Sequence, residues 1–434
     1  MLPSRPDFSD TVERLFPEDS PQGGKKHVLT FTFQVTTECS LCCTYCYQIN
    51  KGHEMMSWDV AKATVDYIFD AAEKPDTVLS YEKVSGIVLD FIGGEPLLNI
   101  DLITKILAYF EEQLLARNSP WLFKHRYSFS TNGVAYFDPR VQKLIDQYGD
   151  LISMGVTVDG HKELHDKCRL FPNGQGSYDY AIKAALDQKD RFGNDSTKIT
   201  LCPENIMETA KAVINMLSLG YKHVFANCVF EEGWTTEHGK ILYEEMKKIS
   251  DYILENDLED ACSVSLFSED DFTPLPDDDT KNWCGGTGRM LAVDHTGNFY
   301  PCVRYMETCL GSDRPPMIVG NIHEGAYQSE NAKKIAEDFS KITRQSQSEQ
   351  KCIDCPIARG CAWCSAYNYQ KFGTANRRAT FICVMHKARA LGNWYYWKKE
   401  AKKKNQTCRC KLYLPADDAV QIIGEKEWND LRGI

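Results

Sequence analysis

The sequence predicts an α/β fold built on a parallel sheet, followed by a cysteine-rich C-terminal part. Three observations lead to this prediction. Strand-like apolar segments alternate with helix-like segments through the N-terminal half of the 434 residues. Polar turn residues mostly follow the strand-like segments, which places them at the edge of a parallel sheet where active sites form. The 18 cysteines gather mainly in one N-terminal loop and in the C-terminal third.

Six segments rich in apolar, β-branched or aromatic residues predict the strands. They cover residues 28–35, 86–92, 126–130, 151–158, 198–202 and 223–229. Helices are predicted between them at 57–72, 102–115 and 205–217, with Ser57 as an N-cap. Four of the strands end at polar motifs, which are Gly-Gly-Glu-Pro at 93–96, Thr-Asn-Gly at 131–133, Asp-Gly at 159–160 and Pro-Glu-Asn at 203–205.

Composition narrows the possible partners. The net charge of −11 argues against nucleic acid. Residues 1–26 hold no apolar run fit for a signal peptide, and no later stretch is long enough to span a membrane. We therefore expect a cytoplasmic protein with no nucleic-acid or membrane partner, in which many cysteines indicate metal clusters. The isolated Cys168, Cys202, Cys228 and Cys262 are expected to be small buried side chains.

The most informative segment is a loop with three cysteines, Cys39, Cys43 and Cys46, in the spacing C-x3-C-x2-C. A four-iron cluster normally takes four thiolates, so three would leave one iron open to a small molecule that binds by its amine and carboxylate. The alternative is a zinc site made of two C-x2-C pairs. No residue would separate these two pairs. Their four thiolates could therefore not surround one zinc ion tetrahedrally without strain in the chain. Cys42 falls outside the pattern and is predicted to be a core thiol.

This spacing, with Tyr45 before the last cysteine, resembles the radical S-adenosylmethionine (SAM) enzymes. The resemblance implies a partial (β/α)6 TIM-like barrel, with SAM on the open iron. One electron then cleaves SAM to a 5′-deoxyadenosyl radical. The alternative is a non-catalytic iron–sulfur electron carrier, in which the strand-end motifs would have no role.

The resemblance also assigns roles to the strand-end residues. Gly93, Gly94, Glu95 and Pro96 would hold the SAM amino group, and Ser130 and Asn132 would lie near the ribose. Thr157 and Asp159 would also serve the ribose, and Leu201 begins a turn expected to pack on the adenine. Arg169 would bind the SAM carboxylate, with an ion pair at the rim as its alternative role.

The C-terminal cysteines resemble those of the SPASM extension, which holds two auxiliary four-iron clusters. By order along the chain, Cys284, Cys302, Cys309 and Cys364 would bind the cluster nearer the active site, and Cys352, Cys355, Cys361 and Cys383 the outer one. Two residues separate Cys361 from Cys364, where the family commonly has three. A zinc site of Cys352, Cys355, Cys361 and Cys364 is the rival. Cys408 and Cys410 stay unassigned, and a hairpin at 290–302 would bring the first auxiliary cluster against the barrel.

These assignments divide the chain into five parts. They are an N-terminal extension (1–27), the radical SAM partial barrel (28–240), a helix and acidic linker (241–283), the SPASM domain (284–390) and a C-terminal tail (391–434). The extension is too short for the leader-binding module with which many peptide maturases begin. A separate leader-binding protein is therefore a possible partner, beside an electron donor such as flavodoxin or ferredoxin.

We predict a radical SAM/SPASM peptide maturase that crosslinks or epimerises a precursor peptide. Sulfatase-maturing enzymes, which make formylglycine, are the alternative. They carry a catalytic Asp directly after the cysteine that matches Cys302, whereas this chain has Val303 and then Arg304. A branch acting on sugars or small alcohols also stays open. The substrate is expected between the barrel mouth and the hairpin, near Arg304 or Tyr305.

Overall fold

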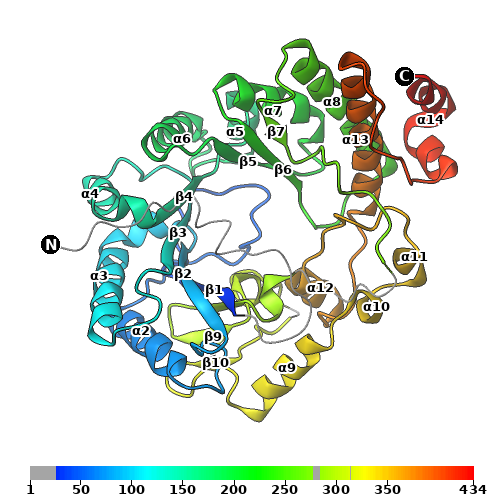
Figure 1. The fold of residues 1–434 in the computed structure, drawn as a ribbon. Helices are drawn as coiled ribbons and strands as arrows, with labels where there is room; N and C mark the ends of the chain where they lie inside the picture. Colours follow the sequence, from blue (N-terminus) through cyan, green and yellow to red (C-terminus); the bar gives the residue numbers. More distant parts are fainter. Residues whose placement is uncertain (1–25, 277–283, 313) are drawn as a thin grey trace.

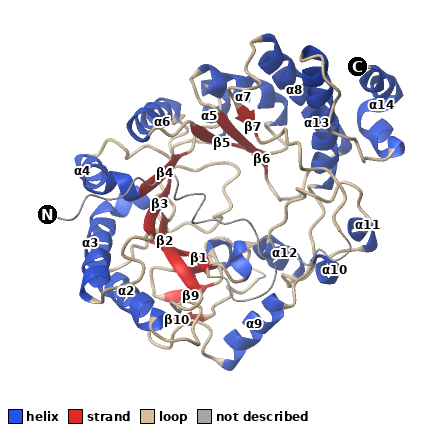
Figure 2. Cartoon of the chain, viewed as in Figure 1, coloured by secondary structure: helices blue, strands red, loops and turns tan. Residues whose placement is uncertain are grey.

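The computed structural model describes residues 26–276, 284–312 and 314–434. Most of the predicted N-terminal extension and part of the acidic linker therefore lie outside the described residues. The chain forms a ring, in which strands face a central space and helices cover the outside (Figures 1 and 2).

Four parallel strands make one side of the ring. They are β1 (His27–Gln34), β2 (Val84–Ile92), β3 (His125–Thr131) and β4 (Ile152–Val156), and each pairs with the next. Their buried aromatic side chains stack from strand to strand, with Phe33 on Phe91 at 5.6 Å and Phe91 on Phe129 at 5.1 Å between ring centroids. This stack forms the core between the sheet and its helices.

The other side of the ring is a separate parallel sheet of β5 (Ser196–Leu201), β6 (His223–Cys228) and β7 (Ser263–Val264). All six predicted strands are thus present, each within two residues of its predicted ends. The prediction of a single six-stranded sheet was wrong, because β4 and β5 are not hydrogen-bonded as neighbours. At this break the Asp159 carboxylate accepts a hydrogen bond from the Thr200 amide at 3.2 Å, in the place of a strand carbonyl.

Helices follow the strands on the outer face (Figure 1). Their bounds are α2 (Trp58–Ala72), α3 (Ile100–Ala116), α4 (Pro139–Tyr148), α5 (Lys162–Cys168), α6 (Tyr178–Phe192), α7 (Thr209–Ser218) and α8 (Thr236–Glu255). Ser57 caps α2 as predicted, accepting from the Val60 amide at 3.3 Å. In α3, Ile103, Ile106, Leu107 and Phe110 recur at helical spacing, and each has no exposed surface. Five short 3-10 turns complete the set at Pro96–Asn99, Gly149–Leu151, Ile206–Glu208, Gly285–Thr287 and Val303–Tyr305.

The C-terminal part joins the barrel sheet directly. The predicted hairpin is present as β8 (Met290–Val293) and β9 (Asn298–Tyr300), followed by β10 (Gly320–Asn321). Asp294 shapes the turn, since one carboxylate oxygen accepts from the amides of Thr296 and Asn298 at 2.9 and 3.0 Å. β8 pairs in parallel with β1, so the sheet order is β10-β9-β8-β1-β2-β3-β4.

The last helices close the ring, and α13 and α14 lie beside α8 (Figure 1). They are α9 (Glu330–Ser340), α10 (Arg344–Gln347), α11 (Gln350–Ile353), α12 (Ser365–Phe372), α13 (Cys383–Lys403) and α14 (Ala416–Gly433). Asp251 of α8 is bound by two residues of α13, Tyr395 at 2.9 Å and Lys399 at 2.6 Å. The predicted tail therefore begins inside α13 and is packed on the barrel.

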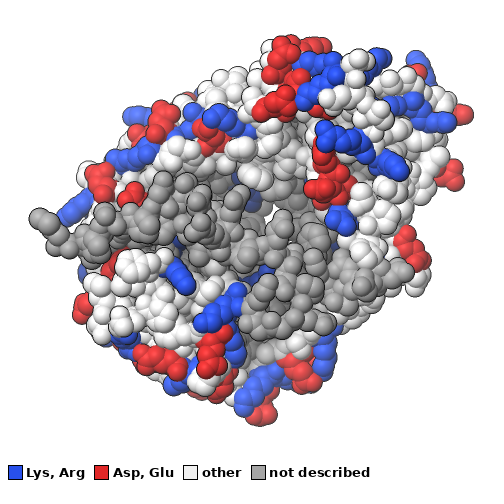
Figure 3. Space-filling view, in the orientation of Figure 1, with Lys and Arg blue, Asp and Glu red and all other residues white. Residues whose placement is uncertain are grey.

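Charges of both signs are interspersed over the outer helices on the face shown in Figure 3. Within the described residues, no helix is both long and apolar enough to cross a membrane.

Candidate active site

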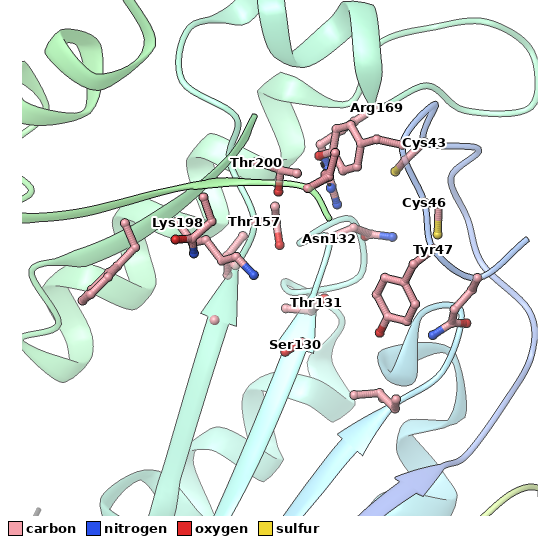
Figure 4. Close-up of a pocket in the computed structure, with 18 of the residues that line it drawn as sticks. Cys43, Cys46, Tyr47, Ser130, Thr131, Asn132, Thr157, Arg169, Lys198 and Thr200 are labelled. Atoms are coloured by element: carbon pink, nitrogen blue, oxygen red, sulfur yellow. Dashed lines mark hydrogen bonds between the residues drawn. The ribbon is translucent and has the colours of Figure 1, made fainter. Parts of the chain in front are cut away.

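The ring encloses a cavity of about 900 Å³. Three parts of the chain line it: the three-cysteine loop, the strands of both sheets at and near their carboxyl ends, and residues of the C-terminal part. Figure 4 shows Cys43 and Cys46 across this space from Thr157, Lys198 and Thr200. The sequence predicted that the active site lies at this edge of the sheet. Many of the predicted site residues do line the cavity there.

The three cysteines of the first loop all line the cavity. Burial raises the pKa of Cys43 to about 11, and the charges of Cys46 and Cys39 add to this rise. Lys51 balances them: burial lowers the pKa of its ammonium, but the three thiols outweigh burial and the pKa is raised. Cys42 is exposed, so its prediction as a core thiol was wrong. Its backbone is held outside the cluster of thiols by a 2.7 Å hydrogen bond to the Leu170 carbonyl.

The glycines of the Gly-Gly-Glu-Pro motif bring the end of β2 against the chain that enters the cysteine loop. A Cβ atom on Gly93 would stand 2.5 Å from the Thr36 carbonyl oxygen, and one on Gly94 only 2.2 Å from that of Glu38. The Gly94 amide donates to the Thr36 carbonyl at 3.1 Å. Both glycines also line the cavity. A side chain at either position would push the cysteine loop away. The first reason for glycine here is therefore the position of this loop.

Glu95 is buried and serves as a brace between strand ends. One carboxylate oxygen accepts from the Thr131 hydroxyl at 2.7 Å, and the other accepts from the Asn132 amide at 2.8 Å. Burial raises the pKa of Glu95, and these donors oppose the rise. The carboxylate reaches the cavity wall, so its predicted contact with the SAM amino group stays a prediction.

Arg169 joins the cysteine loop to the gap between the two sheets. It donates to the Tyr45 hydroxyl at 2.9 Å, and that hydroxyl donates in turn to the buried carboxylate of Asp159. The charge of Arg169 also lowers the pKa of Cys43, against the larger effect of burial. Its Nε atom is buried and has no hydrogen-bond partner among the described residues. This unsatisfied donor beside the three thiols suits a ligand carboxylate.

His165 fixes the backbone on which Asp159 and Arg169 are carried. Its Nδ1 accepts from the Asp159 amide at 3.2 Å, so its Nε2 carries the proton and donates to Ser177 at 3.0 Å. The Ser177 hydroxyl donates to the carbonyl of Arg169 at 2.9 Å. Burial lowers the pKa of His165 to about 3, which keeps the ring neutral.

The other predicted SAM contacts divide into two groups. Ser130, Asn132 and Thr157 line the cavity, and Asn132 also donates to Ser40 in the cysteine loop at 3.0 Å. Pro96, Asp159 and Leu201 are buried behind the wall. The residue before Leu201, Thr200, lines the cavity in its place.

The C-terminal cysteines influence one another in two sets, and the assignment of these sets to two auxiliary clusters stays a prediction. The pKa of Cys302 is raised by burial and then by the charges of Cys364, Cys284 and Cys309. In the second set, the pKa of Cys383 is raised by burial and then, against Lys387, by Cys361, Cys352 and Cys355. Cys364 lies with the first set, which counts against a zinc site that needs it beside Cys361. Among the described residues, no group of three or more His, Cys, Asp or Glu side chains has the spacing of a single-ion site.

The cysteine loop and the first C-terminal set lie against each other. Asn50 donates to the carbonyls of Glu307 and Leu310 at 2.9 and 2.8 Å, and Gln34 of β1 donates to Thr308 at 2.9 Å. The charge of Cys46 contributes to the raised pKa of Cys309, after the larger effect of burial.

Arg304 lines the cavity at this junction and pairs with Glu231 at 2.5 Å. Tyr305 does not reach the cavity, because it is fully buried against Phe339.

Several cavity residues were not singled out from the sequence. They are Lys51, Lys198, Phe225, Asn227 and Glu231. Lys198 could have been found from the sequence, because Ser196, Lys198 and Thr200 alternate with the buried Thr197, Ile199 and Leu201 along β5. Glu231 lies in a loop after β6 that carries no motif, so no sequence pattern indicated it.

Comparisons with known proteins agree with this site. The family of 4Fe-4S single cluster domains matches residues 24–183. A cysteine-type anaerobic sulfatase-maturating enzyme of Clostridium novyi is 30% identical over 351 residues, which are 75% of this chain and 85% of that protein. An uncharacterized protein of Methanocaldococcus jannaschii is also 30% identical, over 36% of this chain and only 45% of its own length.

Solved structures share the fold. Native anSMEcpe with bound AdoMet and Kp18Cys peptide superposes with a TM-score of 0.59 at 16% identity, covering 87% of this chain and 99% of that one. Streptococcus suis SuiB bound to precursor peptide SuiA gives 0.54 at 13% identity, covering 82% and 75%. Taken with the three-cysteine loop and the strand-end motifs around one cavity, the match to the Clostridium novyi enzyme shows that this chain belongs to the radical SAM enzymes, in the family of the anaerobic sulfatase-maturating enzymes.

Proposed function

We propose that this enzyme matures a peptide or protein by removing hydrogen from a side chain or an α-carbon, and so crosslinks or epimerises its substrate. The observation that carries the proposal is the single cavity shared by the three-cysteine loop and the C-terminal part, which contributes Val303, Arg304 and Cys361. A substrate in that cavity would touch both halves of the enzyme. The relatives whose structures contain peptides support this substrate class.

We infer three four-iron clusters. Cys39, Cys43 and Cys46 would hold the one that binds SAM. The two C-terminal sets, each of four thiols, would hold the auxiliary clusters. When bound, SAM and the reduced first cluster supply a 5′-deoxyadenosyl radical.

The chain's own residues would hold SAM and balance its charge. The free Nε of Arg169 is suited to the SAM carboxylate, since a charge-assisted hydrogen bond is about twice as strong as a neutral one. The Lys51 ammonium lies among the three thiols and offsets their negative charge. Ser130, Thr157 and Thr200 supply hydroxyls on the opposite wall, where a ribose could be bound.

Formylglycine formation is the second candidate, and the Clostridium novyi relative favours it. The Asp that such enzymes carry after the matching cysteine is Val303 here, and this side chain lines the cavity. A carboxylate is nevertheless close by, because Glu231 enters the cavity from the loop after β6 and pairs with Arg304.

The test is to incubate the reduced, reconstituted enzyme and SAM with candidate peptides and to follow their mass. Loss of two hydrogens would indicate a crosslink. Deuterium uptake from heavy water with otherwise unchanged mass would indicate epimerisation. Efficient conversion of Cys to formylglycine in a sulfatase-derived peptide would favour the second candidate and contradict the first.

A preliminary assay separates an enzyme from an electron carrier. With SAM and a reductant such as flavodoxin or ferredoxin, the enzyme should form 5′-deoxyadenosine, and a carrier should not.

A further inference from the structure

One wall of the cavity is built from β5 and β6 and is polar. Ser196, Lys198 and Thr200 face the cavity from β5, and Phe225 and Asn227 face it from β6. We call these five residues the β5–β6 wall. Lys198 is directly opposite Phe225 in the pairing of the two strands, and Thr200 is opposite Asn227. Phe225 keeps 49% of its surface exposed, which is unusual for an aromatic side chain in a strand pair.

The charged residues that line the cavity have protein partners, with one exception. Glu231 pairs with Arg304 at 2.5 Å, and Glu95 is bound by Thr131 and Asn132. The cations also have acceptors, since Lys51 donates to the Leu41 carbonyl at 3.1 Å, Arg169 to Tyr45 at 2.9 Å and Arg389 to the Ser265 carbonyl at 2.8 Å. In the part of the chain that the structure describes, Lys198 alone of this set has no hydrogen bond or ion pair.

Lys198 is placed beyond Thr200, the hydroxyl on β5 that is proposed for the SAM ribose. The proposed SAM carboxylate site lies at the three-cysteine loop, where the charges of Arg169 and Lys51 lower the pKa values of the thiols against the larger effect of burial. Lys198 lies on the opposite wall (Figure 4). It is two residues before Thr200, about 7 Å deeper along the strand. The charge of Lys198 slightly lowers the pKa of Asp159, which burial raises overall.

Asn227 offers a second donor beside Lys198. Its side chain is exposed to the cavity and forms no hydrogen bond among the described residues. It lies diagonally across the strand pair from Lys198, a spacing that long side chains can bridge. An ammonium and an amide at this spacing can bind the two oxygens of one carboxylate, and the Phe225 ring can cover its apolar stem.

We propose that the β5–β6 wall recognises a carboxylate of the substrate, with Lys198 as the specificity-determining residue. The carboxylate belongs either to an Asp or Glu side chain near the modified residue or to the C-terminus of the peptide. This inference rests on the proposed peptide-modifying function and adds the chemical class of its substrate.

The experiment uses the reconstituted, SAM-loaded enzyme and a matched set of synthetic peptides. Each peptide has a central Cys or Ser, flanked by Glu, Gln or Lys, with a free or an amidated C-terminus. Binding is measured by fluorescence anisotropy of a labelled terminus, and modification by mass spectrometry. Wild-type enzyme should bind a carboxylate peptide about tenfold or more tightly than its amide counterpart. Comparing Glu with Gln peptides tests a side-chain carboxylate. Comparing free with amidated C-termini tests the terminal carboxylate.

Two variants and a control locate the effect. Lys198→Met should remove the preference, and Lys198→Glu should reverse it toward peptides that carry Lys. Lys240→Met, which changes an exposed lysine on the outside of α8, should keep it. In all three variants, 5′-deoxyadenosine formation without peptide should stay at the wild-type level, which shows that SAM binding is intact.

Three outcomes would overturn the inference. Equal binding of carboxylate and amide peptides by wild-type enzyme would refute it and leave the proposed function standing. Loss of peptide-free 5′-deoxyadenosine formation in Lys198→Met would assign the lysine to SAM instead. An enzyme that cleaves SAM but neither binds nor modifies any peptide of the set would count against the proposed function, and the inference would fail with it.

Discussion

At the scale of single residues, the site is shaped by buried polar groups. These groups lie at or behind the cavity wall and also hydrogen-bond to one another. Glu95, Asp159 and Arg169 were selected from the sequence as ligand contacts. In the structure each also connects separate strand ends. Burial makes these connections strong, because a buried donor or acceptor that loses its partner costs about 1–3 kcal/mol.

Glu95→Gln should therefore weaken both SAM binding and the fold. The amide nitrogen of Gln would face either the Thr131 hydroxyl and the Leu97 amide or the Asn132 amide, and leave a buried donor unpaired. We expect a loss of about 1–3 kcal/mol in the free energy of unfolding, measured by anaerobic denaturant titration. Glu112→Gln, on the exposed face of α3, is the control. An unchanged stability of Glu95→Gln would show that the carboxylate is not a brace.

The buried His165 should make stability depend on pH. Its pKa is about 3 in the folded protein and 6.5 without burial, so the unfolded chain binds more protons between these values. Stability is complete above the higher pKa and falls as the pH drops, by about 1 kcal/mol between pH 6.5 and 5.5. Replacing His165 with Asn should remove this part of the pH dependence in denaturant titrations at several pH values, while the buried His386, whose pKa burial lowers to about 4, keeps its own part. Replacing the exposed His53 should not, and a wild-type slope in the His165 variant would contradict the assignment.

At the scale of elements, the cysteine loop is positioned by neighbours that are distant in sequence. The turn after β2 holds its entrance, Arg169 holds Tyr45 within it, and Asn50 fastens its exit to the C-terminal cysteine loop. The loop contains no regular helix or strand of its own. Its geometry therefore depends on these contacts.

Gly94→Ala tests this dependence. The added Cβ would meet the Glu38 carbonyl oxygen at 2.2 Å, so the loop entrance must move. We expect the variant to lose most of the iron of the first cluster and its SAM cleavage, while it keeps the iron bound by the C-terminal cysteines. Gly149→Ala is the matched control, since its nearest neighbour is a Phe192 ring atom at 3.7 Å. Full SAM cleavage by Gly94→Ala would show that the close approach is dispensable.

Most of these elements could be predicted from the sequence, because their signals are local. Period-two and helical patterns located the strands and helices, and cysteine order separated the two C-terminal sets. The errors have non-local causes. Cys42 was expected in the core, but its direction depends on the contact with Leu170 far along the chain. At the break between β4 and β5 the buried Asp159 accepts from the Thr200 amide, a contact that the sequence of neither strand predicts. Tyr305 and Arg304 are neighbours, and only packing against Phe339 decides which faces the cavity.

At the scale of the whole molecule, the cavity exists only because the C-terminal part completes the ring. The N-terminal strands supply the cysteine loop, and the C-terminal part supplies Val303, Arg304 and Cys361 to the wall. Substrate and SAM would then share one space.

Iron content provides the test at this scale. We expect about twelve irons in the anaerobically reconstituted protein, from three four-iron clusters. Replacing Cys39, Cys43 and Cys46 together by Ala should leave about eight and abolish 5′-deoxyadenosine formation. Iron is measured by a colorimetric assay and cluster type by electron paramagnetic resonance. About four irons with stoichiometric zinc would instead support a zinc site in the C-terminal part.

The pairing of β1 with β8 also has a consequence for the time course of synthesis. β1 begins at His27 and its outer neighbour β8 at Met290, so the ribosome completes one edge of the sheet long after the other. At about 5–20 residues per second, the wait is on the order of ten to fifty seconds. During that interval the outer edge of β1, with its unpaired amides and carbonyls, is a template for pairing with other chains. The nascent enzyme is thus most vulnerable to aggregation before its last third emerges, and slow translation of that third would lower the yield of folded protein.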